Sequence, residues 1–442
     1  YFSGNQIRIL EAGVPVPDES ESDGSPSRKS GWLDLSRVRI AINYQDEWSQ
    51  MFREAWRLQK EFFWNEQLSG VDWNAVYRRY ENLLSRIGSR SELSDLIWEM
   101  QGELGTSHAY EYGGDYPFSP QYPVGQLGAD LEYEPSRKAW VFRKIYRGDI
   151  WRVHQHSPLA EPGQQVQEND LLLEIGGVPL DASTSPGELL VHQAGQAVQL
   201  TVKTPGKKES KRKIIVKTLI HEGKTRYREW VKQNLKFVEA QSEGRVGYLH
   251  IPDMDTEGIA EFHRGFLSQV DREGLIIDAR FNAGGWVSPL VLEKLTHRHL
   301  GYDVPRWGSP ESYPYHTLRG HLVLITNQFT GSDGDMFTAS FKQLKLGKVI
   351  GKRTWGGVVG IDGRYQLVDG TTTTQPQYSI WFHHAGWSVE NYGVDPDLVV
   401  EDPPQSYSNG MDHQLKQAVE VIQKILEEDP LPKIQDFKSN SR

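Results

Sequence analysis

Apolar residues recur at three- and four-residue steps through the first part of the chain, from about residue 43 to residue 100. This period places apolar side chains along one face of a helix. The positions that set it are Trp48, Met51, Phe52, Ala55 and Trp56. Two further periodic stretches, residues 72–84 and 91–100, predict two more helices, the second with Ser91 as its N-cap. We therefore predict a small helical bundle in which the aromatic stripe is packed core.

Strand-like and helix-like patterns alternate in the second half of the chain, from about residue 219 onward. Short apolar runs predict strands, and longer amphipathic runs predict the helices between them. The predicted strands include 246–251, 274–279 and 321–326, and the predicted helices include 256–270, 332–344 and 411–427. This alternation is typical of an α/β domain with a parallel or mixed sheet.

The middle of the chain, residues 122–217, is β-rich and is punctuated by Gly and Pro at short intervals. It contains a glycine-bearing opening loop at 124–128, the run Asn-Asp-Leu-Leu-Leu-Glu-Ile-Gly-Gly at 169–177, and a closing strand at 197–202. This order resembles a PDZ domain. PDZ domains add an extended peptide as a strand and hold its terminal carboxylate on backbone amides. The alternative is a module that serves only as a structural spacer.

The remaining stretch, at the start of the chain, predicts a strand in residues 1–10, followed by a polar linker at 18–30. The sequence thus predicts a multidomain α/β protein. Its expected parts are a strand remnant and linker at 1–38, a helical bundle with a Ser-His motif at 39–121, a PDZ-like domain at 122–218, and an α/β catalytic domain at 219–442.

Composition narrows the classes of function. Of the 442 residues, 11% are aromatic, which indicates folded domains, and the net charge of −10 argues against nucleic acid or an anionic membrane as partner. No apolar run reaches the ~18 residues of a membrane span. Cysteine is absent, which excludes disulfides and a thiol nucleophile. The first residue is Tyr1, so we expect a fragment or a processed product.

A serine stands where the predicted strand 321–326 turns into the next helix. Ser332 lies between Gly331 and Gly334, where small residues allow close approach of a substrate. The following amide, of Asp333, lies in the first turn of the helix, where free N–H groups favour a developing negative charge. Ser332 is therefore a candidate nucleophile. The alternative is a simple N-cap, since Gly-Ser-Asp-Gly departs from the full G-x-S-x-G pattern.

Three other stretches could complete a catalytic site with this serine. His108, next to Ser107, offers an imidazole whose ordinary pKa suits proton transfer near neutral pH. The glycines of residues 281–286 offer backbone amides to a reacting oxygen. Glu390 offers a carboxylate that could orient the base.

These motifs together resemble the C-terminal processing serine protease family, in its tricorn-like branch. The resemblance covers roughly residues 40–425 and is carried, in order, by Gly-Thr-Ser107-His108, residues 278–285, residues 327–334 and Glu390 to Pro396. It implies an α/β domain of the crotonase-like or ClpP-like kind. The implied tetrad has Ser332 as nucleophile, His108 as general base and acid, Ser107 as bridge and Glu390 as orienter. An acyl-enzyme would form, and the implied oxyanion hole is Asp333 with one glycine of the pair Gly284–Gly285, taken as Gly285.

The resemblance also implies context. Asp303 would draw basic side chains into a specificity pocket, substrates would be short or unfolded peptides, and the assembly would be a cytoplasmic homo-oligomer, a hexamer by resemblance. The family carries β-propellers ahead of this half, of which only the first residues here could be a remnant. We expect no cofactor and no metal, and we interpret His297, His299, His383 and His384 as surface histidines, because neither pair lies in an H-E-x-x-H pattern.

Two rival functions remain open on the sequence. One is a catalytically inactive, PDZ-containing scaffold that binds peptides. The other is an acyl-thioester enzyme, since the α/β order also resembles enoyl hydratases, although those enzymes need neither Ser332 nor His108. The complete set of Ser332, His108 and Glu390 favours a serine peptidase, because a decayed enzyme would more often have lost one member.

Overall fold

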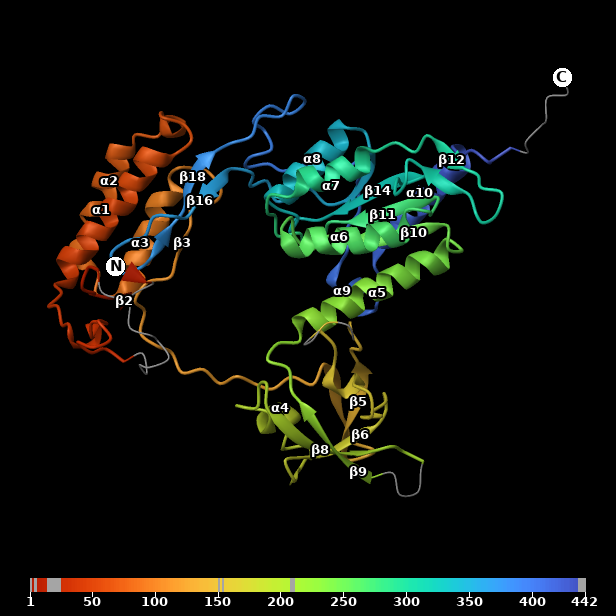
Figure 1. Ribbon diagram of the computed structural model, residues 1–442, viewed down its shortest axis with the longest axis horizontal. Helices are drawn as coiled ribbons and strands as arrows, with labels where there is room; N and C mark the ends of the chain where they lie inside the picture. The colour runs from red at the N-terminus through yellow and green to blue at the C-terminus, as the bar shows by residue number, and fades with distance from the viewer. Residues whose placement is uncertain are drawn as a thin grey trace.

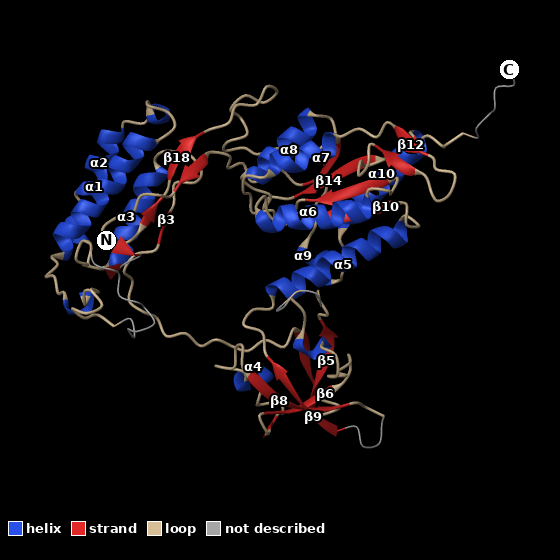
Figure 2. Ribbon diagram, viewed as in Figure 1, coloured by secondary structure: helices blue, strands red, loops and turns tan. Residues whose placement is uncertain are grey.

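The structure is a computed structural model, and it describes residues 2–3, 6–13, 25–149, 152, 155–206 and 211–435. Three bodies are visible in Figure 1: a helical bundle, an α/β unit beside it, and a β-rich unit below α5 of the α/β unit. Figure 2 shows that helices cover the sheet of the α/β unit, whereas the β-rich unit consists of strands and loops with the short helix α4 at one side. The predicted fold class is confirmed.

The helical bundle consists of α1 (Tyr44–Phe62), α2 (Trp73–Glu81) and α3 (Arg90–Gly102). Its first helix begins at an Asn43 cap, and the third begins at Ser89. The Ser89 hydroxyl accepts the Glu92 N–H while the Glu92 side chain accepts the Ser89 N–H, a capping box that satisfies two amides at once. The predicted N-cap at Ser91 was therefore wrong by two residues, because the reciprocal bond to Glu92 selects Ser89.

A long segment of the α/β unit, residues 360–378, packs against the bundle, and we call it the excursion. Its strands β16 (Gly360–Asp362) and β18 (Gln375–Tyr378) pair antiparallel and run alongside the bundle, as Figure 1 shows. Leu367, which lies between these two strands in sequence, is buried among the bundle's apolar side chains. Strand β17 (Thr372–Thr373) pairs with β3 (Glu111–Tyr112), directly after the Ser-His motif. The bundle core thus contains a residue that lies 265 positions after the end of α3 (367 − 102).

Buried ion pairs stabilise the contact between the bundle and the excursion. The Arg90 guanidinium donates to Glu111 at 2.7 Å and to Asp369 at 2.8 Å, with side chains at most 6% exposed. Losing one partner of such a buried pair leaves an uncompensated charge, which costs several kcal/mol. This network therefore holds the loop after α3 against the excursion, and with it the position of residues 105–110.

The β-rich unit has the predicted PDZ-like organisation. Its sheet has the order β4-β5-β6-β8-β9, all antiparallel, with β7 on β6. The elements are β4 (Ala129–Glu134), β5 (Ala139–Ile145), β6 (Leu171–Ile175), β7 (Val178–Pro179), α4 (Pro186–Leu189), β8 (Ala197–Lys203) and β9 (Lys211–Lys217). Its core forms a separate cluster that includes Phe142, Leu172 and Leu200. Strand β4 lies at the edge of this sheet.

The α/β unit contains a five-stranded, fully parallel sheet of order β10-β11-β14-β15-β19. Successive side chains of β11 pack on opposite faces: Leu275 and Ile277 face one core, and Ile276 faces the other. The strands are β10 (Val246–His250), β11 (Gly274–Asp278), β14 (His321–Thr326), β15 (Gly347–Gly351) and β19 (Leu398–Val399). The helices are α5 (Gly223–Gln241), α6 (Thr256–Gln269), α7 (Ser288–Thr296), α8 (Asp333–Gln343), α9 (Pro404–Ser408) and α10 (His413–Glu428).

Two small hairpins complete the described elements. Near the start of the chain, β1 (Phe2–Ser3) pairs with β2 (Gln6–Ile7), and after α7, β12 (Gly301–Asp303) pairs with β13 (Glu311–Tyr313). Of the predicted linker at 18–30, residues 18–24 lie outside the described residues. Within the part of the chain that the structure describes, every helix is too short or too polar to cross a lipid bilayer.

The arrangement of the sheet determines where chemistry can occur. In a parallel sheet the carboxyl ends of all strands meet at one edge, and the loops that follow them lie together there. Strand β14 leads into Ser332, and strand β11 leads into residues 281–285. The candidate nucleophile and the candidate oxyanion glycines therefore come from neighbouring strands of one sheet.

Candidate active site

Ser332 lies at the turn between β14 and α8, in a backbone conformation that side chains rarely adopt. Its φ is 54° and its ψ is −119°, and its side chain makes no capping hydrogen bond to the helix. A non-glycine residue in such a conformation stores roughly 1–3 kcal/mol of strain, which the surrounding structure must hold in place. Because the hydroxyl does not cap α8, the simple N-cap interpretation lacks its hydrogen bond. The geometry resembles a strained nucleophile turn.

Close packing of small residues makes this turn possible. A Cβ built on Gly284 would lie 2.5 Å from the Ser332 Cβ, so only glycine allows the loop after β11 to approach the serine. The Gly334 N–H donates to the Gly331 carbonyl at 2.8 Å, which closes the turn. The two loops are thus pressed together, with the serine side chain between them.

His108 and its neighbours form a hydrogen-bonded chain across two parts of the sequence. The Ser107 Oγ lies 2.8 Å from His108 Nδ1 and 3.2 Å from Glu390 Oε2. The Thr374 hydroxyl, between β17 and β18, donates to the His108 carbonyl at 2.6 Å and so holds the histidine backbone. Ser107, His108 and Glu390 therefore lie in one hydrogen-bonded series, although Ser107 and Glu390 are 283 positions apart in sequence.

Glu390 is held by more donors than the Ser107 hydroxyl. The N–H groups of Val358 and Val359 donate to its Oε2 at 2.7 and 3.1 Å. On the other oxygen, the Ser107 N–H donates at 2.7 Å and the Thr106 hydroxyl at 3.2 Å. A carboxylate that accepts several hydrogen bonds is fixed in orientation. Glu390 thus presents a rigid negative charge to the Ser107–His108 pair.

The histidine itself is buried. Its side chain is packed edge-on against Trp355 and Tyr110, with ring centroids 5.3 and 5.5 Å away, and the residue is 8% exposed. Burial lowers the pKa of His108 because it disfavours the charged imidazolium, and the negative charge of Glu390 raises that pKa in part. The neutral form, which can accept a proton, is therefore favoured near neutral pH.

The two predicted oxyanion glycines differ in whether their backbone N–H group is already hydrogen-bonded. The Gly284 N–H donates to Asn282 Oδ1 at 2.9 Å, so this donor is already used. Across the described residues, the N–H groups of Gly285 and Asp333 donate to no protein acceptor. Asp333 is the first residue of α8, where the helix dipole adds to the attraction for an anion. The free amides of Gly285 and Asp333 are thus the pair available to an oxyanion.

The Asp333 side chain has a different role from the Asp333 backbone amide. Its carboxylate accepts the Ser288 N–H at 2.9 Å and also the Ser288 hydroxyl. Ser288 begins α7, directly after the glycine loop. Burial raises the pKa of Asp333, and these two hydrogen bonds oppose that rise. The carboxylate therefore anchors the glycine loop to the nucleophile turn while the amide of the same residue stays free.

Ser332, His108 and Gly285 line one cavity of about 660 Å³. In the part of the chain that the structure describes, no hydrogen bond joins Ser332 to His108, although both face this space. Such bonds are often long in unliganded sites and tighten when substrate binds. The other lining residues are Tyr110, Asn282, Ala283, Trp286, Gln328, Phe329, Gly331, Trp355, Val359, Gly360, Ile361 and Tyr378.

Asp303, which the resemblance assigns to a specificity pocket, does not line this cavity. It is at the end of β12 in the β12–β13 hairpin. Its carboxylate lies near the Tyr315 hydroxyl and raises the pKa of that phenol. The specificity role assigned to Asp303 by resemblance stays a prediction.

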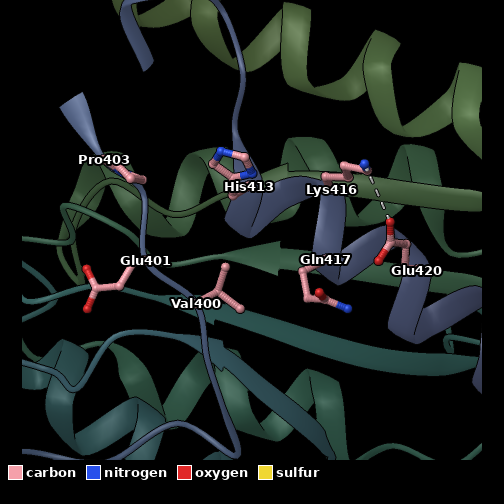
Figure 3. A pocket seen from close by; sticks show the side chains of 7 residues that line it. All are labelled: Val400, Glu401, Pro403, His413, Lys416, Gln417 and Glu420. Carbon is pink, nitrogen blue, oxygen red and sulfur yellow. Dashed lines mark ion pairs between the residues drawn. The ribbon is translucent and has the colours of Figure 1, made fainter. Parts of the chain in front are cut away.

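A second pocket, near the start of α10, has different chemistry. Figure 3 shows Lys416 in an ion pair with Glu420, and Glu401 on the opposite side of the pocket. Glu401 pairs with Lys352 at 2.7 Å, and His413 Nε2 contacts the Ser406 hydroxyl. Its charges are therefore matched by other residues, and the predicted site residues lie elsewhere. Within the described ranges, no cluster of three or more His, Asp or Glu side chains is arranged to hold a metal ion.

Several supporting residues escaped sequence reasoning. Asn282 uses its Oδ1 to hold Gly284 and its carbonyl to accept the Gly331 N–H at 3.0 Å, which joins the two loops. Asp335 accepts the Gly356 N–H at 2.9 Å, and burial raises its pKa to about 6. The sequence pointed only to the runs that contain these residues or their partners, 278–285 and the glycine-rich run 356–360, because the contacts depend on partners distant along the chain.

Three segments of the chain match known protein families. The family model described as "Tricorn protease C1 domain" matches residues 44–102, "Tricorn protease PDZ domain" matches 125–221, and "Peptidase family S41" matches 245–400. Ser332, Gly285 and Glu390 lie inside the last match. Ser107 and His108 lie in the segment between the first two matches, outside all three of these matches.

Individual proteins are similar over most of the chain. A tricorn protease homolog of Saccharolobus solfataricus is 46% identical over 422 residues, which is 96% of this chain and 38% of that protein. The tricorn protease of Thermoplasma volcanium is 42% identical over 426 residues, 96% of this chain and 40% of that protein. The crystal structure of the tricorn protease superposes with a TM-score of 0.85 at 38% identity, and the match covers 90% of this chain and 38% of that one.

The chain therefore spans about two fifths of the length of these relatives. Its three matched segments occur in the order bundle, PDZ domain and S41 domain, and together they account for the three bodies of the fold. The chain belongs to the tricorn protease family, of which it carries the C1, PDZ and S41 peptidase domains.

Proposed function

We propose that this chain is a serine peptidase that hydrolyses peptide bonds through Ser332, His108, Ser107 and Glu390. The observation that carries the proposal is the hydrogen-bonded series from Glu390 through Ser107 to His108, in the same cavity as a strained serine. Two unused backbone amides, of Gly285 and Asp333, complete the set of groups that acyl transfer needs.

The hydrogen bonds indicate which nitrogen of His108 acts as base. The Glu390 carboxylate can only accept, so the Ser107 hydroxyl gives it its one proton. The Ser107 oxygen then accepts from His108 Nδ1–H, which leaves Nε2 unprotonated and able to take a proton from Ser332. Glu390 acts through Ser107 in this scheme, as a positioning residue that stabilises the imidazolium once it forms.

The reaction follows from these roles in two steps. The Ser332 oxygen attacks the peptide carbonyl carbon while Nε2 of His108 takes the hydroxyl proton, and the negative oxygen is bound by the Gly285 and Asp333 amides. His108 then protonates the leaving amine, the C–N bond breaks, and an acyl-enzyme ester remains on Ser332. Water, deprotonated by His108, hydrolyses this ester and releases the acid.

The substrate class that fits is a peptide in extended conformation. The cavity is lined by aromatic side chains of Trp286, Phe329 and Tyr378, each at least half exposed, which suits apolar contact with a peptide. Assembly as a hexamer, a cytoplasmic location, and a role for Asp303 in selecting basic side chains stay predictions.

A fluorophosphonate probe tests this proposal directly, because it labels only an activated serine. We expect the 442-residue chain to be labelled at Ser332. Labelling should disappear in Ser332→Ala, which lacks the oxygen, and in His108→Ala, which lacks the base. Mass spectrometry of the labelled peptide identifies the site.

The control for this experiment is Ser388→Ala, an exposed serine close to Glu390 in sequence, which should be labelled like the unchanged chain. Absence of labelling in a folded sample would contradict the peptidase proposal and favour the peptide-binding scaffold. Labelling that persisted in Ser332→Ala would place the nucleophile elsewhere.

The pH dependence of kcat/KM provides an independent check of the base. Because burial lowers the pKa of His108, we expect kcat/KM to rise with pH through a midpoint below the ordinary imidazole value of 6.5. Glu390→Gln removes the charge that raises this pKa, so the midpoint should move further down. The same change should lower kcat by roughly 10²–10³-fold, because an amide NH₂ would face the Val358 and Val359 N–H donors. A midpoint above 6.5, or one that rises in the variant, would contradict the assignment.

A further inference from the structure

A larger cavity than that at Ser332 lies between the PDZ-like unit and the α/β unit. Its volume is about 950 Å³. In Figure 1, α5 runs between these two units, and it supplies one wall of the cavity. Lys144 and Tyr146 of the PDZ-like unit supply another wall, and residues next to α10 supply a third. Cavities at the junction of domains are common positions for ligand sites.

The walls of this cavity are aromatic. Tyr227, Trp230 and Phe237 project from α5, and Phe281 projects from the loop after β11. Phe237 and Phe281 are 36% and 54% exposed, so they present apolar surface that the described chain does not cover. Exposed aromatic side chains that surround a cavity are typical of binding surfaces.

One cation in this cavity has no acidic partner. The Lys144 ammonium lies 4.8 Å from the centre of the Tyr146 ring, and across the described residues it makes no ion pair. The nearby carboxylates are occupied. Asp130, opposite Lys144 on β4, is bound by Arg226 at 2.9 Å and by the Tyr146 hydroxyl at 2.7 Å.

Glu222, which pairs with the lining residue Arg226, and Asp412, the acidic residue among the described residues of the lining, are also engaged. Glu222 pairs with Arg226 at 2.7 Å, and it accepts the Gly128 N–H at 3.1 Å. Asp412 pairs with Arg280 at 2.8 Å. Lys144 is therefore the group in this lining that is available to an incoming anion.

The contact between Glu222 and Gly128 also affects where the carboxylate of a ligand can bind. Gly128 lies in the glycine-bearing loop that opens the PDZ-like unit, and PDZ domains hold a peptide carboxylate on backbone amides. Here an internal carboxylate already occupies this amide. A carboxylate of a ligand meets less competition at Lys144 than at the Gly128 amide.

The large cavity adjoins the candidate active site through two phenylalanines. Phe281 lines the large cavity, and Phe329 lines the cavity that contains Ser332. Their rings stack with centroids 5.6 Å apart and planes 15° apart. The Asn327 Oδ1 accepts the backbone N–H of both residues at 3.1 Å, so one side chain holds the pair in register. A peptide bound at Ser332 could continue over this aromatic ridge.

We propose that the large cavity is a remote subsite for the peptide substrate, which takes an apolar side chain against Phe237 and Phe281 and a carboxylate at Lys144. The proposal rests on the peptidase function proposed above. The carboxylate belongs either to the peptide's C-terminus or to an acidic side chain near it. The subsite selects peptides that carry this combination of an apolar and an anionic group.

The test uses the Ser332→Ala variant of the full chain, which binds peptide without cleaving it. The probe is a fluorescein-labelled octapeptide that ends in Leu-Phe with a free carboxylate, and its Kd is measured by fluorescence anisotropy. Lys144→Met should raise Kd about tenfold, the size of one charge-assisted contact. Lys144→Arg should restore binding, and Phe237→Ser should weaken it.

Further measurements test the position of the site, the need for a carboxylate on the peptide, and the source of that carboxylate. Lys203→Met, on β8 of the same unit and outside the cavity, should leave Kd unchanged. The C-terminal amide of the peptide should bind about as weakly to the parent as the acid binds to Lys144→Met. An amidated peptide with Glu next to its last residue distinguishes the sources: restored affinity assigns the site to a side-chain carboxylate, and continued weakness assigns it to the terminus.

The outcomes also separate this proposal from the peptidase proposal. Fluorophosphonate labelling of the unaltered chain tests Ser332 alone, whereas the binding test needs no catalysis. An equal Kd for the acid in Lys144→Met and in its parent, with labelling intact, would overturn the subsite and leave the peptidase standing. Lack of measurable peptide binding by the Ser332→Ala chain would overturn the subsite as well.

Discussion

Replacing His108 by alanine will lower kcat/KM for a peptide substrate by about four to six orders of magnitude, because Ser332 then has no base to take its proton. The ring is held in place by Ser107, by the Thr374 hydroxyl on the backbone, and by Trp355. Its loss therefore removes a positioned group that solvent cannot replace. The measurement is steady-state hydrolysis of a quenched fluorescent peptide.

Two comparisons make this result specific. His297→Ala removes an exposed histidine at the end of α7 and should leave kcat/KM unchanged. The double variant His108→Ala with Ser332→Ala should be no slower than either single variant, because residues that act as a unit have non-additive effects. A His108→Ala enzyme with nearly full activity would rule out the proposed base.

Gly284→Ala is expected to lower kcat by about 10²–10³-fold, the usual cost of a damaged oxyanion hole. The new methyl group would lie 2.5 Å from the Ser332 Cβ and 2.9 Å from the Gly331 carbonyl, at a φ of +83° that alanine tolerates poorly. The glycine loop must move away, and the Gly285 amide moves with it. Single-turnover kinetics with an activated ester will report the loss.

The matched control is Gly187→Ala in α4, where an added Cβ meets no atom within 4 Å. This variant should keep both its kcat and its melting temperature. A Gly284→Ala protein that is folded and fully active would show that the loop after β11 is not held against the nucleophile as the structure indicates.

Much of the fold was predictable because each helix or strand turns the same face to the core. Buried apolar residues therefore recur along it with the period of that element. The strand 321–326 was predicted with its observed bounds, and α6 and α8 were predicted to within a residue at each end. The cap of α3 was misplaced although the sequence carried the signal: Ser89 has Glu92 three residues later, the S-x-x-E pattern of a capping box, whereas Ser91 has Ser94 there.

The candidate site also has a part that the sequence predicted and a part that only the structure revealed. Sequence motifs named Ser332, His108, Ser107 and Glu390, and the structure places the last three in one hydrogen-bonded series. Their catalytic roles remain proposals. The Val358 and Val359 amides that hold Glu390 carry no sequence signal, because a backbone N–H is the same in every residue except proline.

The sequence by itself determined many of the helices and strands, the three-part organisation and the residues that could carry chemistry, because these follow from local residue type and spacing. Only the tertiary structure decided that Leu367 belongs to the bundle core, that the Gly285 amide is free while that of Gly284 is used, and that Lys144 faces a cavity without an acidic partner. These facts depend on which groups meet across hundreds of residues, and a hydrogen bond or an ion pair exists only when both partners are placed.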